Sequence, residues 1–303
     1  MAIDLQSIIN SPFGVELASF IGQTIPPSVG YRIADLVAEW IATRRQSTLV
    51  RGIRTNQWVI HGDGLDRETL DQVVRENLKN IAHSLYSLYH YIHDPKAIRD
   101  MVDLDPVARG LVERPEFSDR GLMLVGLHLS NFDFVLQSMC MQGLKAFVLT
   151  IPNPQGGQRM EYEMRKRTGM NLVPASVSAL RNAVKYLEQG GVVLTGIDRP
   201  VPDSRAKPRF FGRTSSLPTH HIYLAMKANV PVMVIATRLG RDGRYHVETS
   251  EPIEMESFSD YDNGSVRNAE RVLKEAERFI LQTPEQWNMS LPVWPDLMDS
   301  VPV

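Results

Sequence analysis

Four short, uninterrupted apolar runs between residues 122 and 237 constrain the fold of this chain more than any other feature. They lie at Leu122–Leu127, Ala146–Ile151, Val192–Ile197 and Val232–Thr237. A continuous apolar run of this length is typical of a strand that is buried on both faces. Segments with a helical spacing of apolar residues separate the runs. Alternating strands and helices predict an α/β fold, with a mostly parallel central sheet flanked by helices.

The first hundred or so residues are predicted to be helical. From Tyr31 onward, apolar residues recur at positions that lie on one stripe of a helix. Pro26 and Pro27 separate this helix from a shorter one before it. A longer helix is predicted over Asp66–Ile92, because Pro95 follows the last residue of its apolar stripe.

The remaining pattern completes a one-domain prediction. Tyr245–Thr249 alternates in the manner of a more exposed strand, and a final helix is predicted over Val266–Leu281. No internal repeat or flexible linker divides the chain. We therefore expect a single domain over residues 1–303, in which a helical N-terminal region (1–115) packs on an α/β core (116–303).

Composition excludes several classes of protein. The formal net charge is −2, so the chain as a whole has no general attraction to nucleic acid, and no nucleic-acid partner is expected. A single cysteine, Cys140, rules out an internal disulfide. No stretch approaches the ~18–20 apolar residues of a membrane-spanning helix, and the sequence around Asp4 does not resemble a signal peptide. We therefore expect an intracellular protein that is soluble or attached to a surface.

The segment Gly126–Asp133 contains the clearest candidates for chemistry. His128 follows a predicted buried strand, and Asp133 falls in the first turn of the next helix. Ligands of α/β folds bind at the carboxyl ends of the strands. A histidine there, with a carboxylate at its second ring nitrogen, can act as an oriented general base. A structural alternative stays open, because Ser130 and Asp133 also match a capping box.

Charged residues follow two other predicted elements. Asp198 and Arg199 come just after a buried strand, where an ordinary ion pair in a loop is the alternative interpretation. Arg165 and Arg167 lie in a basic stretch that ends a predicted helix at Gly169. Cations are common in a last helical turn, but arginines can also hold a phosphate or a developing oxyanion.

Other familiar sites find little support in the sequence. It contains neither a Gly-x-Ser-x-Gly elbow nor a Walker A motif. His83, His90, His93 and Glu76 could share a helix face, but a polar edge explains them more simply than a metal site. Cys140 lies in an apolar helical pattern and is expected in the core rather than as a nucleophile.

Several segments, in consistent order, resemble the lysophospholipid-type acyltransferase superfamily. His128 and Asp133 match its HX4D/E signature. The closer similarity is to the branch that contains the lipid A lauroyl/myristoyl and the phosphatidylinositol mannoside acyltransferases. The similarity covers roughly Phe20–Trp294. Its further matching segments are an Arg-x-Arg-x-Gly at Arg165–Gly169, then Gly196–Arg199, a Phe-Phe-Gly segment at Arg209–Pro218, Leu224–Val232 and Pro284–Trp294.

Two positions depart from the pattern of the family. Arg213 stands where relatives often carry an acidic or a small residue, and His220 with His221 replaces a stretch of small residues. Both departures lie near the expected substrate site. The resemblance therefore does not identify the acceptor.

The resemblance implies transfer of a fatty acyl chain from a thioester to a hydroxyl group of a glycolipid or phospholipid. The donor is expected to be acyl-CoA or acyl-carrier protein. His128 is expected to act as the general base and Asp133 to orient its ring. Arg165, or alternatively Arg167, is expected to stabilise the oxyanion or hold a donor phosphate. No metal or cofactor is expected, because a thioester is already activated.

The resemblance also implies substrate contacts further along the chain. Asp198 and Arg199 are expected to shape the acceptor pocket. Phe210 and Phe211 are expected to line a groove for the acyl chain, with Arg213 beside them.

A lipid acceptor implies contact with a membrane. We expect peripheral attachment to the cytoplasmic face of the cell membrane through the helix Tyr31–Arg45 and the arginines after it. The alternative is that this helix packs on the α/β core. Two other functions stay open, namely a thioester hydrolase of the same fold and a catalytically silent lipid-binding relative.

Overall fold

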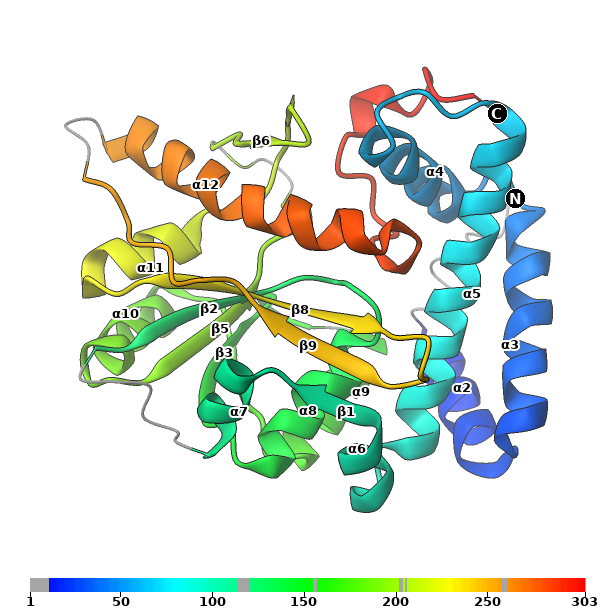
Figure 1. The fold of residues 1–303 in the computed structure, drawn as a ribbon, viewed down its shortest axis with the longest axis horizontal. Coiled ribbons are helices and arrows are strands. Elements are labelled where there is room, and N and C mark those ends of the chain that lie inside the picture. The colour runs from blue at the N-terminus through cyan, green and yellow to red at the C-terminus, as the bar shows by residue number, and fades with distance from the viewer. Residues whose placement is uncertain are drawn as a thin grey trace.

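A single seven-stranded sheet forms the centre of the described chain (Figure 1). The computed structural model describes residues 11–113, 120–154, 157–201, 204, 206–257 and 261–302. The strand order is β1-β9-β8-β2-β5-β3-β4, and neighbouring strands are parallel except β8 and β9. The predicted, mostly parallel α/β sheet is therefore confirmed. The strands are β1 (Val102–Leu104), β2 (Leu122–Gly126), β3 (Ala146–Thr150), β4 (Asn171–Pro174), β5 (Val192–Gly196), β8 (Val232–Leu239) and β9 (Tyr245–Thr249).

Helices cover both faces of this sheet, which explains the uninterrupted apolar runs. Successive residues of β2 point to opposite faces: Met123 and Val125 join a core with α10, α11 and α12, while Leu122 and Leu124 join a core with α7 and α8. Figure 1 shows these two helical layers. Their helices are α7 (Pro106–Glu113), α8 (Phe132–Gln142), α9 (Gly157–Arg167), α10 (Val177–Glu188), α11 (His220–Ala228) and α12 (Tyr261–Gln282).

The N-terminal helices pack beside the sheet around one long helix, α5. The predicted helix over Asp66–Ile92 is confirmed, since Asp66 caps α5 and Ile92 follows its last residue. The break at Pro26 and Pro27 is also confirmed. Figure 1 shows α3 outside α5, at the edge of the molecule. The helices are α2 (Pro12–Thr24), α3 (Pro27–Ala42), α4 (Thr48–Ile60), α5 (Arg67–Tyr91) and α6 (Pro95–Met101).

Small residues, rather than the apolar stripe, bring α3 against α5. Gly30, Ala34 and Ala38 of α3 are buried. A Cβ at Gly30 would lie 2.1 Å from a ring carbon of Tyr86, so only glycine allows this close approach. The predicted apolar stripe instead leaves Leu36, Val37 and Trp40 exposed on the outer surface.

The N-terminal region also contributes a strand that the sequence did not predict. Strand β1 lies within residues 1–115, yet it pairs in parallel with β9 at the edge of the sheet. The predicted division between residues 115 and 116 lies outside the described residues. The short strand β4 and the helices α4, α6 and α7 were likewise not predicted.

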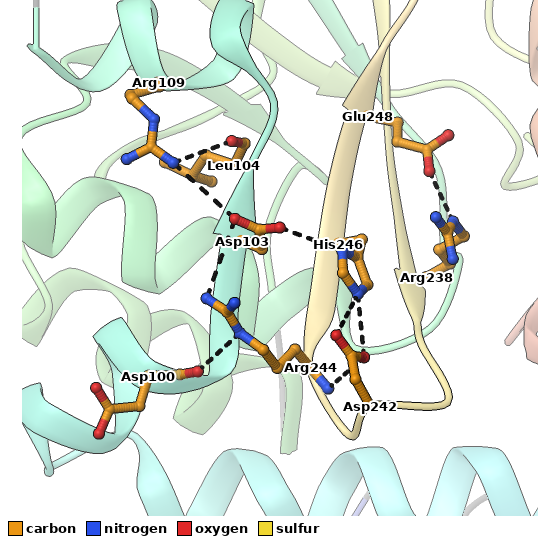
Figure 2. Close-up of polar contacts among 9 residues, drawn as sticks. All are labelled: Asp100, Asp103, Leu104, Arg109, Arg238, Asp242, Arg244, His246 and Glu248. Carbon is orange, nitrogen blue, oxygen red and sulfur yellow. Dashed lines mark hydrogen bonds and ion pairs between the residues drawn. The ribbon is translucent and has the colours of Figure 1, made fainter.

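A network of charged side chains fastens this edge strand (Figure 2). His246 of β9 lies between two carboxylates, with Nδ1 3.4 Å from Asp103 of β1 and Nε2 3.0 Å from Asp242. Arg244 donates from Nε to the carbonyl oxygen of Asp100 at 3.0 Å. A three-residue strand offers few backbone bonds, so these side chains add the contacts that hold it.

The C-terminal segment returns to the carboxyl edge of the sheet. It contains the 3-10 turns η1 (Pro284–Gln286) and η2 (Pro295–Leu297) and lies beside α4 and α5 (Figure 1). Asn77 donates to the carbonyl oxygens of Glu285 and Trp287, each at 2.9 Å. The helical region thus holds a segment that reaches the candidate site.

Candidate active site

The candidate site is built around a histidine–aspartate pair at the carboxyl ends of β2 and β5. His128 follows β2, and Asp198 follows the neighbouring strand β5. Nδ1 of His128 lies 2.7 Å from Oδ1 of Asp198, and the backbone N–H of His128 donates to Oδ2 at 2.9 Å. Asp198 is fully buried, whereas the His128 side chain is 22% exposed. The histidine therefore has one fixed ring nitrogen and one reachable edge.

The charge of Asp198 is stabilised by its partners. Burial by itself raises the pKa of this carboxyl, but the charge and hydrogen bonds of His128, with a bond from Trp287, outweigh burial and lower the pKa. An ionised carboxylate at Nδ1 orients the ring, selects the tautomer that leaves Nε2 free to accept a proton, and stabilises the imidazolium.

The C-terminal segment holds the loop that carries His128. The backbone N–H of Asn288 donates to the carbonyl oxygen of His128 at 2.7 Å, and the Asn288 side chain donates to that of Ser130, also at 2.7 Å. Ser130 in turn donates its backbone N–H to Gln286 at 2.7 Å. Trp287 donates from Nε1 to Oδ2 of Asp198 at 2.9 Å. This short stretch therefore touches both members of the pair.

The capping box considered for Ser130 and Asp133 does not form. The residue that caps α8 is Asn131, which makes no side-chain bond to the helix. Ser130 has a φ of +51°, a left-handed conformation that non-glycine residues rarely adopt. Asn131 donates its side-chain amide to Ser84 and Tyr245. Tertiary contacts, rather than a helix cap, hold this turn.

The expected contact between Asp133 and His128 is wrong in this structure. Asp133 accepts two hydrogen bonds of 2.9 Å from Arg165 of α9, and a third of 3.1 Å from Gln137. Burial alone lowers the pKa of Arg165, but the charge and hydrogen bonds of Asp133, together with the charge of Glu161, outweigh burial and raise the pKa. Asp133 therefore ties α8 to α9, and Asp198 has the position that the sequence assigned to Asp133.

This pairing also changes what the predicted cations can do. Both carboxylate oxygens of Asp133 engage Arg165, and Arg167 is exposed at the end of α9. Arg199 follows Asp198 directly and makes no ion pair or hydrogen bond within the described chain. Burial lowers its pKa, and the nearby charges of Glu161, Arg165 and Asp198 also act on it. Arg199 is thus the half-buried cation beside the pair whose donors remain available.

The residues expected along an acyl groove lie in and around an aromatic cluster. Phe210 has no exposed surface and stacks on Trp294, with ring centroids 5.8 Å apart. Phe211 is half-buried and also packs against Trp287 and Trp294. Arg213 pairs with Asp63 in the loop after α4. The structure thus places Phe211 nearest to solvent, while Phe210 supports its neighbours and Arg213 fastens the hairpin of β6 (Arg209–Phe210) and β7 (Arg213–Thr214).

His220 and His221 lie at the start of α11, beside β5. Nε2 of His220 lies 3.1 Å from the hydroxyl of Thr195. His221 is fully buried, and neither ring nitrogen has a hydrogen-bond partner among the described residues. Burial lowers the pKa of His220 to about 4, and it lowers the pKa of His221 well below its usual range. Both rings are therefore neutral at physiological pH.

The remaining reactive side chains have structural surroundings. Burial raises the pKa of Cys140 to about 12, so the thiol on α8 stays protonated. Nε2 of His83 lies 2.8 Å from Asp35, and Nδ1 of His90 lies 2.6 Å from the carbonyl oxygen of Gly22. These two histidines of α5 therefore contact α3 and α2.

The contribution of the C-terminal segment was not predicted from the sequence. Trp287 lies in a segment that matches the family, but no role was expected for it or for Asn288. The available signal was that the motif lies at the end of the chain, outside the α/β pattern, and contains a tryptophan with one donor. Which carboxylate it reaches depends on tertiary packing.

The comparisons agree with the resemblance that these residues carry. A family model described as bacterial lipid A biosynthesis acyltransferase matches residues 13–295. No curated protein matches the chain. The matched range includes the histidine–aspartate pair, the Asp133–Arg165 pair and the C-terminal segment. The chain therefore belongs to the bacterial lipid A biosynthesis acyltransferase family, within the lysophospholipid acyltransferase superfamily.

Proposed function

We propose that this protein transfers a fatty acyl chain from a thioester donor, acyl-CoA or acyl-carrier protein, to a hydroxyl group of a glycolipid or phospholipid at a membrane. The observation that carries the proposal is the His128–Asp198 pair, whose buried carboxylate fixes Nδ1. No hydrogen bond to Nε2 is found among the described residues. Nε2 is therefore available to a substrate hydroxyl.

The pair performs the proton transfers of the reaction. Nε2 of His128 takes the proton of the acceptor hydroxyl as the oxygen attacks the thioester carbonyl carbon. Asp198 stabilises the imidazolium that forms. When the tetrahedral intermediate collapses, the carbon–sulfur bond breaks, and the departing thiolate takes the proton from His128. The products are an ester and a free thiol, and the histidine is returned to its starting state.

Arg199 is better placed than Arg165 to stabilise the negative charge that develops during the reaction. Negative charge develops on the carbonyl oxygen during the attack, and an uncommitted guanidinium in a partly buried site stabilises such charge. Arg165 already directs two donors to Asp133. Arg199 is adjacent to Asp198 and makes no ion pair within the described residues, so it is the better candidate for the oxyanion or a donor phosphate.

The outer surface of α2 and α3 supports attachment to a membrane. Half of the large hydrophobic side chains that the described structure exposes lie on these two helices: Phe13, Leu17, Phe20, Val29, Leu36, Val37 and Trp40. An apolar helical face of this kind inserts into the headgroup region of a bilayer. The described helices include none with the length and apolar character to cross one. Helix α2 also contacts α9, which carries Arg165.

The basic cluster expected to help this attachment is largely paired within the protein. Arg45 and Arg54 both contact Asp71, and Arg51 contacts Asp299. Arg44 instead lies over the ring of Trp40, with its guanidinium carbon 4.8 Å from the ring centroid. The apolar face, rather than the arginine cluster, therefore carries the membrane proposal.

Thiol release from palmitoyl-CoA, with and without a detergent extract of bacterial glycolipids, tests the function. We expect release to increase with the extract and to yield a heavier lipid by mass spectrometry. His128→Ala should fold, and its transfer rate should be lower than that of the wild-type protein by a factor of about 10²–10⁴. His83→Ala removes another histidine–aspartate contact, at 2.8 Å on α5, and should retain transfer.

Each other result has a defined meaning. Release that ignores the extract indicates a thioester hydrolase. Release from acyl-carrier protein alone retains the transferase and changes its donor. Absence of release with both donors, or near-full activity of His128→Ala, refutes the proposal.

A further inference from the structure

Trp287 contacts the aspartate that pairs with the proposed general base. Its Nε1–H donates to Oδ2 of Asp198 at 2.9 Å, and the ring is almost fully buried. We propose that Trp287 is a positioning residue, whose indole N–H fixes the carboxylate of Asp198 so that Oδ1 faces Nδ1 of His128. The inference rests on the proposed function, in which His128 is the base.

The geometry assigns this task to the indole because a carboxylate is planar. Oδ2 of Asp198 accepts two donors, the backbone N–H of His128 and Nε1 of Trp287, both at 2.9 Å. Holding one oxygen from two directions also sets the direction of the other, which lies 2.7 Å from Nδ1. Asp198 has no exposed surface, so bulk water supplies no replacement donor. Without the indole, the carboxylate loses one of its three bonds.

The indole is itself held in place from two sides. Leu129 and Trp287 form an antiparallel bridge, which ties the backbone of the tryptophan to the loop of the base. Phe210 packs edge-on against the ring, with centroids 5.9 Å apart. Phe210 therefore supports Trp287, and Trp287 in turn orients the carboxylate of Asp198.

The hydrogen bond from the indole also acts on His128 through the charge of Asp198. A donor to a carboxylate shares its negative charge, and a carboxylate with fewer donors holds an imidazolium more strongly. Removing the Nε1–H should therefore favour the imidazolium and move the acidic limb of the rate profile to higher pH. A tryptophan that only fills space would have no such effect.

Trp294 offers a matched control within the same aromatic cluster. It is also buried, and its centroid lies 6.4 Å from that of Trp287. Its Nε1 has no hydrogen-bond partner within the described structure. Phenylalanine at either position removes the same volume, but only Trp287→Phe removes a bond to Asp198.

The test compares the pH dependence of kcat/KM for wild-type protein, Trp287→Phe and Trp294→Phe, each checked for folding by circular dichroism. In Trp287→Phe we expect the acidic limb to shift to higher pH by about half a pH unit or more. We also expect the plateau value of kcat/KM to fall about tenfold, because the base is less well oriented. Trp294→Phe should leave the limb in place. Trp287→Phe should also add no further loss in an Asp198→Asn background.

Equal profiles for the two phenylalanine variants overturn the inference, as does a lower plateau without a shifted limb. If wild-type protein shows no transfer, the proposed function fails instead. Transfer with an unshifted limb refutes only the role of Trp287.

A second measurement applies even if Trp287→Phe does not fold. The chain contains four tryptophans, so ¹⁵N-labelled protein gives few indole N–H signals to assign. Single replacements of Trp40, Trp58 and Trp294 identify the signal of Trp287 by exclusion. We expect that signal to move with pH across the acidic limb of the rate profile, and to stop moving in His128→Gln. An unresponsive signal in the wild-type protein contradicts the contact.

Discussion

Asp133 and Arg165 form a two-pronged ion pair, with both hydrogen bonds at 2.9 Å, between the first turn of α8 and the last turn of α9. The acid that lies five positions after His128 thus serves another helix. The carboxylate that contacts His128 comes instead from Asp198, at the end of the adjacent strand. Spacing in sequence and contact in space therefore select different acids.

The two aspartates should respond differently to loss of charge. Asp198→Asn removes the carboxylate at Nδ1, so kcat should fall by about 10²–10⁴ through the wrong tautomer and orientation of His128. Asp133→Asn weakens the ion pair with Arg165 and should lower kcat by a smaller factor. The acidic limb of its pH profile should stay at the wild-type position. Steady-state rates across pH distinguish the two. A shifted limb in Asp133→Asn would show that this acid acts on His128 directly.

The pair of Asp133 and Arg165 should also contribute to stability. Both side chains are mostly buried, so Asp133→Asn leaves a guanidinium without its full partner and should cost about 2 kcal/mol. The further change Arg165→Met should recover part of that loss, which denaturant unfolding of the single and double variants measures. Asp100→Asn breaks an exposed pair with Lys96 and should leave the midpoint unchanged. Additive effects of Asp133→Asn and Arg165→Met contradict the coupling.

The sheet could be predicted from the sequence because its central strands are buried on both faces. Residues of β2 alternate between two cores, so no polar position interrupts the run. The edge strands were harder to predict. β1 has only three residues. It is held by its pairing with β9 and by the contact between Asp103 and His246, and these partners lie far from β1 in the sequence.

The site could be predicted in its location but not in its pairings. Sequence reasoning placed His128 and Asp198 at the ends of two buried strands, and parallel neighbours bring such ends together. Which acid turns toward the ring depends on α9, because Arg165 of that helix binds both carboxylate oxygens of Asp133. The donor from Trp287 comes from a segment with no periodic pattern, so only the packed chain reveals it.

The buried histidines of α11 should make the protein less stable in mild acid. Burial lowers the pKa of His220 in the folded protein to about 4, and it also lowers the pKa of His221 well below its usual range. Between about pH 6.5 and 4, the unfolded chain binds more protons, so stability decreases as the pH falls through this range. Between about pH 7.5 and pH 5, His220 should cost about 2 kcal/mol, and His221 should add a loss in the same direction. Urea unfolding at the two pH values measures the loss.

The double variant His220→Gln, His221→Leu removes both titrating rings. Glutamine can keep a hydrogen bond to Thr195, and leucine removes the two unpartnered nitrogens of His221. We therefore expect the variant to match or exceed wild-type stability at about pH 7.5 and to lose less of it at about pH 5. An equal loss in both proteins would exclude these histidines as the cause.

The apolar face of α3 should determine binding to lipid vesicles. Leu36 is 71% exposed and Trp40 is 49% exposed, so insertion into a bilayer would bury most of the surface of both. At roughly 1.5–3 kcal/mol for each large apolar side chain, replacing both by glutamate should weaken binding more than tenfold. Val177→Glu is the control, because Val177 is 68% exposed on the α/β core. Vesicle co-sedimentation gives the comparison.

Ionic strength separates an apolar attachment from an electrostatic one. Since acids pair with Arg45, Arg51 and Arg54, added salt should weaken vesicle binding less than the Leu36→Glu, Trp40→Glu change does. If moderate salt abolishes binding while the double variant binds like the wild-type protein, the arginines attach the protein instead. Loss of binding in Val177→Glu would place the membrane on the face of α10. If binding depends on α3 and neither on the arginines nor on α10, the edge of the molecule beside α2 and α9 faces the membrane that contains the lipid acceptor.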